Sequence, residues 1–152
     1  MALDDTIALL REAPLIGLFD PDALRLLAFS AETRRLRQGE VLFHRGDRSD
    51  GGYVVTSGAI GIATPGSEPE LHLGPGSLIG RVALFVRTER PATATAREPS
   101  ELLRISPTLM RRVLAAFPSA ADGLRDAMAE DLAGLTADLA RIGDRLLASG
   151  RN

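Results

Sequence analysis

The stretch that decides the fold reads Gly76-Ser77-Leu78-Ile79-Gly80-Arg81-Val82-Ala83-Leu84-Phe85, and Arg90-Pro91-Ala92-Thr93-Ala94 follows it closely. A glycine turn leads into one short apolar helical turn, and a lone arginine then begins a strand of small residues. Backbone N–H groups at the start of a helical turn, with a guanidinium beside them, suit one phosphate group. We therefore expect an anion-binding pocket lined by Gly80, Arg81, Val82, Ala83, Arg90 and Ala92.

Short apolar segments broken by turn residues extend outward from this stretch over residues 32–106. The segments are Leu36, Val41-Phe43, Tyr53-Val55, Ala59-Thr64, Leu71-Leu73, Ala92-Ala96 and Leu102-Ile105. Ten of the 15 glycines lie between Gly39 and Gly80, so tight turns recur along the same region. Many short strands at this spacing predict an antiparallel β-roll or jelly roll.

Helical patterns flank the predicted roll on both sides. Residues 3–30 are helical in pattern, with Asp20 and Pro21 as the cap and first turn of the second helix. Ser106 with Pro107 predicts another helix start, and Pro118 then separates it from a last helix over residues 119–148. The chain is thus expected to be mainly β with flanking helices. Residues 1–118 form the helical entry and the roll, and residues 119–152 form a long C-terminal helix.

Apolar residues on the last predicted helix repeat at intervals of four and three. They are Met128, Leu132, Leu135, Leu139, Ile142 and Leu146. This spacing is typical of a heptad seam, which predicts a homodimer or contact with a protein partner. The alternative is that the helix folds back on its own roll.

Composition excludes several classes of function. The 152 residues carry a formal charge of −2 and no cysteine, so neither a basic nucleic-acid footprint nor a thiolate or disulfide site is expected. No apolar run approaches a membrane span, and the N-terminus lacks the basic start of a signal peptide, which favours a cytoplasmic protein. His44 and His72 are isolated, so we expect no metal site. No nucleophile motif or catalytic carboxylate pair stands out, so we expect no catalytic residues, no cofactor and no enzymatic activity.

Three further motifs precede the decisive stretch in a fixed order. Gly39-Glu40-Val41-Leu42-Phe43-His44-Arg45-Gly46-Asp47 reads as a hairpin, and Tyr53-Val54-Val55-Thr56-Ser57-Gly58 reads as a strand. Leu73-Gly74-Pro75-Gly76 reads as the entry to the decisive stretch itself, residues 76–94, which we call the cassette. With these motifs the chain resembles, over almost its whole length, the cyclic-nucleotide-binding domain family, the regulatory domain of catabolite-activator-like proteins. The resemblance implies a β-roll with flanking helices.

The resemblance also implies a ligand and a mode of action. Arg90 stands where the family's arginine pairs with the cyclic phosphate, and residues 80–83 supply the backbone N–H groups for the same phosphate. The implied ligand is cAMP or cGMP, and the implied function is a non-catalytic regulatory module that signals through its C-terminal helix. No helix-turn-helix segment follows that helix, so we expect no nucleic-acid binding by this chain itself.

Two positions depart from the family's pattern. Arg81 occupies the place of the glutamate that accepts the ribose hydroxyl, and Pro91 removes one N–H donor. A guanidinium only donates hydrogen bonds. Loss of a charged hydrogen bond of about 1.5–3 kcal/mol weakens binding by roughly ten- to a hundredfold.

Three interpretations of Arg81 follow. The chain binds a cyclic mononucleotide at reduced affinity, or it accepts a more anionic ligand such as a cyclic dinucleotide or another phosphorylated metabolite. The third interpretation is a degenerate domain that binds no nucleotide and serves as an interaction or dimerisation scaffold. Glu89, next to Arg90, is a candidate to neutralise either arginine and close the pocket.

Overall fold

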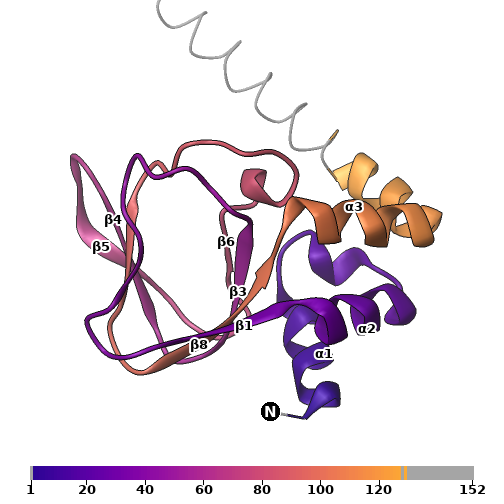
Figure 1. Cartoon of the computed structure of the whole chain (residues 1–152), viewed down its shortest axis with the longest axis horizontal. Helices are drawn as coiled ribbons and strands as arrows, with labels where there is room; N and C mark the ends of the chain where they lie inside the picture. Colours follow the sequence, from indigo (N-terminus) through magenta and orange to yellow (C-terminus); the bar gives the residue numbers. More distant parts are fainter. Residues whose placement is uncertain (1, 128, 130–152) are drawn as a thin grey trace, which may run out of the picture.

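The computed structural model describes residues 2–127 and 129, and its centre is a roll of two four-stranded antiparallel sheets (Figure 1). The strands are β1 (Glu32–Leu36), β2 (Val41–Phe43), β3 (Gly52–Ser57), β4 (Ile60–Thr64), β5 (Ser67–Leu73), β6 (Leu78–Ile79), β7 (Thr93–Ala96) and β8 (Ser100–Ile105). The strand order is β1-β8-β3-β6 in one sheet and β2-β7-β4-β5 in the other. The prediction of an antiparallel roll is therefore confirmed.

Helices flank the roll, as the sequence predicted. They are α1 (Leu3–Glu12), η1 (Ile16–Leu18), α2 (Pro21–Ser30), η2 (Val82–Leu84) and α3 (Pro107–Ala116), and residues 118–127 are also helical. Figure 1 shows α1, α2 and α3 grouped at one end of the roll, with the β4–β5 hairpin at the other. None of the described helices is both long enough and apolar enough to cross a membrane.

Alternation along β3 and β8 divides the apolar core into two parts, because successive side chains of a strand face opposite sides of the sheet. Val54 and Leu103 lie opposite each other and pack against the helices. Tyr53, Val55 and Leu102 face the inside of the roll. Both faces of this sheet are thus buried. One face packs against the helices, and the other faces the interior of the roll.

The two predicted helix caps have different outcomes. The Ser106 hydroxyl accepts a hydrogen bond from the Leu109 N–H at 3.1 Å, which confirms it as the cap of α3. Asp20 is the N-cap residue, immediately before the first residue of α2, but its side chain makes no capping hydrogen bond there. Its carboxylate instead accepts a hydrogen bond from the Ser119 hydroxyl, which links the start of α2 to the helical residues 118–127. All six residues of the predicted heptad seam, from Met128 to Leu146, lie outside the described residues.

Candidate functional site

A two-residue strand and a glycine position the cassette turn. Leu78 and Ile79 of β6 pair with Val54 and Tyr53 of β3, and the chain then turns at Gly80 into η2. Gly80 has φ +78°, a region that glycine adopts far more readily than other residues. A Cβ atom at this position would lie 2.7 Å from Nη1 of Arg90. A glycine is therefore required for the turn and for the approach of the arginine.

Arg90 is a buried cation in the interior of the roll. Its side chain is 3% exposed, and its Nη2 donates hydrogen bonds to the Gly51 carbonyl at 2.8 Å and to Oδ1 of Asp50 at 3.0 Å. The guanidinium carbon lies 4.2 Å from the ring centre of Phe43 and 5.6 Å from that of Tyr53. Ion pairing and two aromatic faces stabilise the buried charge. Its Nε is buried and has no hydrogen-bond partner among the described residues.

Asp50 connects Arg90 with two further side chains. Its carboxylate accepts a hydrogen bond from the Tyr53 hydroxyl at 3.0 Å, and Oδ2 lies 3.9 Å from Nη1 of Arg104. Burial, followed by the nearby charge of Asp50, raises the pKa of Tyr53 to about 12. The Asp50 side chain is 52% exposed, so this carboxylate reaches from the solvent toward the interior of the roll.

Backbone hydrogen bonds fasten Arg90 to the loop that precedes β3. The Arg90 N–H donates to the Asp47 carbonyl at 2.8 Å, and the Gly46 N–H donates to the Arg90 carbonyl at 2.8 Å. The Ser49 N–H donates to the Thr88 carbonyl at 2.7 Å, and the Ser49 hydroxyl accepts from the Thr88 N–H at 2.9 Å. Residues 46–49 and 88–90 consequently form one paired ribbon.

Arg90 lines a pocket of about 190 Å³ inside the roll. The other lining residues are mostly apolar: Phe43, Ile62, Leu71, Leu73, Leu78, Ile79, Gly80, Pro91 and Ala92. A single cation among apolar walls is suited to one anionic group attached to a less polar body. The volume lies below the roughly 300–1,000 Å³ typical of small-molecule sites, so the pocket is small for a nucleotide.

The structure brings together only part of the predicted site. Gly80, Arg90 and Ala92 line the pocket inside the roll. Arg81 and Val82 line a different pocket of about 220 Å³, on the side of the cassette that faces Leu15, Phe85 and Val86. Ala83 is buried at 1% exposure, and the adjacent Leu84 packs with the helices.

Sequence reasoning missed the residues that hold Arg90 in place. The carboxylate that reaches Arg90 is Asp50, forty positions away, whereas the neighbouring Glu89 makes only a backbone bridge with Arg48 in the described part of the chain. Phe43 and Tyr53 belong to motifs that were recognised for the fold, but no sequence signal marked them as neighbours of the arginine.

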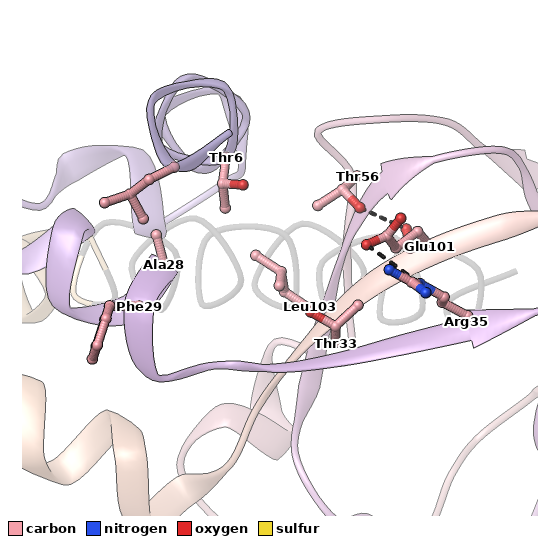
Figure 2. Close-up of a pocket in the computed structure, with 9 residues that line it drawn as sticks. Thr6, Ala28, Phe29, Thr33, Arg35, Thr56, Glu101 and Leu103 are labelled. Carbon is pink, nitrogen blue, oxygen red and sulfur yellow. Dashed lines mark hydrogen bonds and ion pairs between the residues drawn. The ribbon is translucent and has the colours of Figure 1, made fainter. Parts of the chain in front are cut away.

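A third pocket of about 320 Å³ lies on the outside of the roll, where α1 and α2 meet β1 and β8 (Figure 2). Figure 2 shows the Arg35 and Glu101 side chains meeting at one end, and their charged atoms are 4.0 Å apart. The Thr56 hydroxyl donates to the Glu101 carbonyl. The charge of Arg35 in this pocket therefore has a carboxylate beside it. Within residues 2–127 and 129 there is no cluster of histidine and carboxylate side chains that would hold a metal ion.

Comparisons of the sequence and of the structure with known proteins find similarity to the same kind of domain. Residues 33–117 match the cyclic nucleotide-binding domain family. The cAMP-dependent protein kinase regulatory subunit of Yarrowia lipolytica is 32% identical over 100 residues, which cover 66% of this chain and 26% of that protein. This chain therefore spans about a quarter of that relative's length.

Two solved structures support the assignment. The N-terminal domain of a transcriptional regulator from Streptomyces coelicolor A3(2) is 33% identical with a TM-score of 0.78, over 86% of this chain and 94% of that one. A cyclic nucleotide-binding-like protein from Brucella abortus is 38% identical with a TM-score of 0.66, over 74% of this chain and 99% of that one.

Proposed function

The chain belongs to the cyclic nucleotide-binding domain family, and from this premise we propose that it is a non-catalytic sensor of cAMP or cGMP with reduced affinity. The observation that carries the proposal is the position of Arg90. Its guanidinium lies beside Gly80 at the wall of the pocket inside the roll, where one phosphate group would meet both the cation and the backbone of the cassette turn.

Ligand binding in this proposal is an exchange of anions on Arg90. The cyclic phosphate replaces the Asp50 carboxylate, and the backbone N–H groups of residues 80–83 donate to its remaining oxygen atoms. Because the Asp50 side chain is already half exposed, it can turn into the solvent when it is displaced. The nucleoside then occupies the apolar part of the pocket.

The same exchange explains a reduced affinity. The guanidinium is already satisfied by Asp50 and Gly51, and the pocket must expand from about 190 Å³ before a nucleotide fits. If only a minor open state binds, the apparent affinity falls in proportion to its population. An opening cost of about 2 kcal/mol corresponds to roughly thirtyfold weaker binding. Arg81 in place of an acceptor for the ribose hydroxyl reduces the affinity further.

A route for the signal runs through η2. Leu84 of η2 is fully buried in the cluster that also contains Leu109, Met110 and Val113 of α3. A shift of the cassette turn on phosphate binding would therefore move the surface against which α3 packs. We propose that this displacement reaches the C-terminal helix, through which the protein pairs with a second copy or with a protein partner.

A degenerate scaffold that binds no nucleotide is the alternative. It is favoured by the small volume of the pocket and by the ion pair that Arg90 already forms with a carboxylate of the same chain. In that function the Arg90–Asp50 pair is a structural link inside the roll, and the helices provide the interaction surface.

Calorimetric titration with cAMP and with cGMP separates the two functions. A sensor gives heat at micromolar to sub-millimolar ligand, and Arg90→Ala abolishes it. Arg45→Ala removes an exposed arginine from the nearby loop and is the matched control, which should leave the heat unchanged. A thermal melt first verifies that the wild-type protein is folded at the concentration used. If neither nucleotide then gives heat, the sensor function is rejected and the scaffold function remains.

Arg81→Glu tests the cause of the reduced affinity. It introduces the acceptor that the family has at this position, so it should strengthen cAMP or cGMP binding by roughly tenfold or more. An unchanged affinity would assign the weakness to the Arg90–Asp50 pair and the small volume of the pocket instead.

A further inference from the structure

A pocket of about 440 Å³ lies outside the roll, between the end of the cassette, β8 and the start of α3. It is more than twice as large as the pocket that contains Arg90. The lining residues are Asp50, Phe85, Val86, Arg87, Arg104, Ser106, Pro107, Thr108 and Arg111. None of the residues that the resemblance assigned to the ligand belongs to this lining.

Positive charge predominates in this pocket. The lining contains three arginines, Arg87, Arg104 and Arg111, and one acidic residue, Asp50; a carboxylate outside the lining, that of Glu32, pairs with Arg104. The charge of Asp50 is already balanced by Arg90 on the inner side. Arg87 and Arg111 have no carboxylate partner among the described residues. In the pocket of Figure 2, by contrast, the single arginine is paired with a glutamate.

Two of the three arginines are held in place by neighbouring groups. Arg104 donates to the Asp50 carbonyl at 2.7 Å and pairs with Glu32 at 2.9 Å. Arg111 donates to the Thr108 hydroxyl at 3.3 Å, which holds its guanidinium over the first turn of α3. That turn begins a ten-residue helix, whose partial positive charge has the same sign as the guanidinium groups.

We propose that this pocket binds a small organic anion that carries a phosphate group, at a site separate from the pocket inside the roll. Arginine forks match phosphate oxygen atoms geometrically, and three arginines from three segments of the chain line this pocket: Arg87 from a loop, Arg104 from β8 and Arg111 from α3. Phe85, Val86 and Pro107 provide apolar wall for the organic part of such a molecule. The volume falls within the range typical of small-molecule sites.

The test is calorimetric titration of the full chain with phenyl phosphate and with inorganic pyrophosphate at low ionic strength. Arg87→Ala and Arg111→Ala remove exposed side chains, so both variants should fold, which a thermal melt verifies. Each should weaken the binding of phenyl phosphate by about tenfold. Arg112→Ala is the matched control, because Arg112 is an exposed neighbour on the same helix but does not line the pocket.

Binding with these variant effects, unchanged by saturating cAMP, supports the site. Three results of these titrations overturn the proposal: no binding of either phosphate compound at millimolar concentration, an equal loss in Arg112→Ala, or complete competition by cAMP. The first means that the pocket takes no phosphate group, the second that binding is non-specific attraction to surface charge, and the third that the compounds enter the roll. An acidic peptide that binds where the phosphate compounds do not would assign the surface to a protein partner and also overturn it.

Discussion

Asp50→Asn removes the charge that balances the buried arginine without removing much volume. In the wild type, one carboxylate oxygen lies 3.0 Å from Nη2 of Arg90, which is 3% exposed. The asparagine carbonyl can still accept that hydrogen bond and the one from the Tyr53 hydroxyl. The variant therefore isolates the charge of the pair from its geometry.

The expected loss in the free energy of unfolding follows from how deeply Arg90 and Asp50 are buried. Removing one member of a fully buried pair costs about 3–5 kcal/mol. Asp50 is 52% exposed and is screened by solvent, and the Gly51 carbonyl and two aromatic rings remain around the cation. We therefore expect the free energy of unfolding to fall by about 2 kcal/mol, which lowers Tm by roughly 6 °C for a domain of this size.

Urea denaturation at neutral pH, with thermal melts in parallel, measures this loss. Asp126→Asn is the matched control, because Asp126 is exposed and makes no ion pair within the described residues. The variant should also bind cAMP or cGMP about tenfold more tightly, since the competing carboxylate is gone. Equal stability of the Asp50 and Asp126 variants, with no gain in affinity, would refute the argument that Asp50 neutralises Arg90.

Three more predictions concern the same region and the core. Gly80→Ala should lower the free energy of unfolding, measured with urea, by about 2–4 kcal/mol, because the new Cβ meets Arg90. Gly39→Ala is the matched control and should cost only about 1 kcal/mol, because Gly39 also has a positive φ of +88° but has open space around it. Tyr53 is the single tyrosine, so its ionisation can be followed by ultraviolet absorbance and should occur near pH 12. Because the pKa of Tyr53 in the folded protein exceeds the ordinary tyrosine value of about 10, the stability present below pH 10 should decline by roughly 2–3 kcal/mol between pH 10 and pH 12. Leu102→Ala empties part of the roll's interior, where Leu102 is 0% exposed, and should cost about 2–5 kcal/mol by the same denaturation assay.

Local patterns in the sequence contain most of the information on the fold. The apolar run Val41-Leu42-Phe43 predicts β2 with its observed bounds, and the Ser106-Pro107 pair predicts the start of α3. The two-residue strand β6 was missed, because its pairing depends on β3 and not on its own pattern. Asp20 was predicted as a cap from its position alone, whereas tertiary packing directs its carboxylate to Ser119.

The candidate site is harder to predict because its key contacts are distant in sequence. Arg90 and Gly80 are found from the cassette motif. The partner Asp50 lies in a loop whose sequence signals only a turn, and its role appears only when the loop pairs with residues 88–90. The cluster of Arg87, Arg104 and Arg111 likewise draws on three elements and forms no motif in the sequence.

The paired ribbon of residues 46–49 and 88–90 has a consequence for the speed of any response. Because Arg90 exchanges two backbone hydrogen bonds with the opposite segment, it cannot move far unless several amides release together. Any shift of the Arg90 backbone when a ligand binds would then be a concerted event that releases these hydrogen bonds together. The amides of Gly46, Ser49 and Arg90 would exchange their hydrogens with solvent as a group, and bound ligand would slow all three by the same factor.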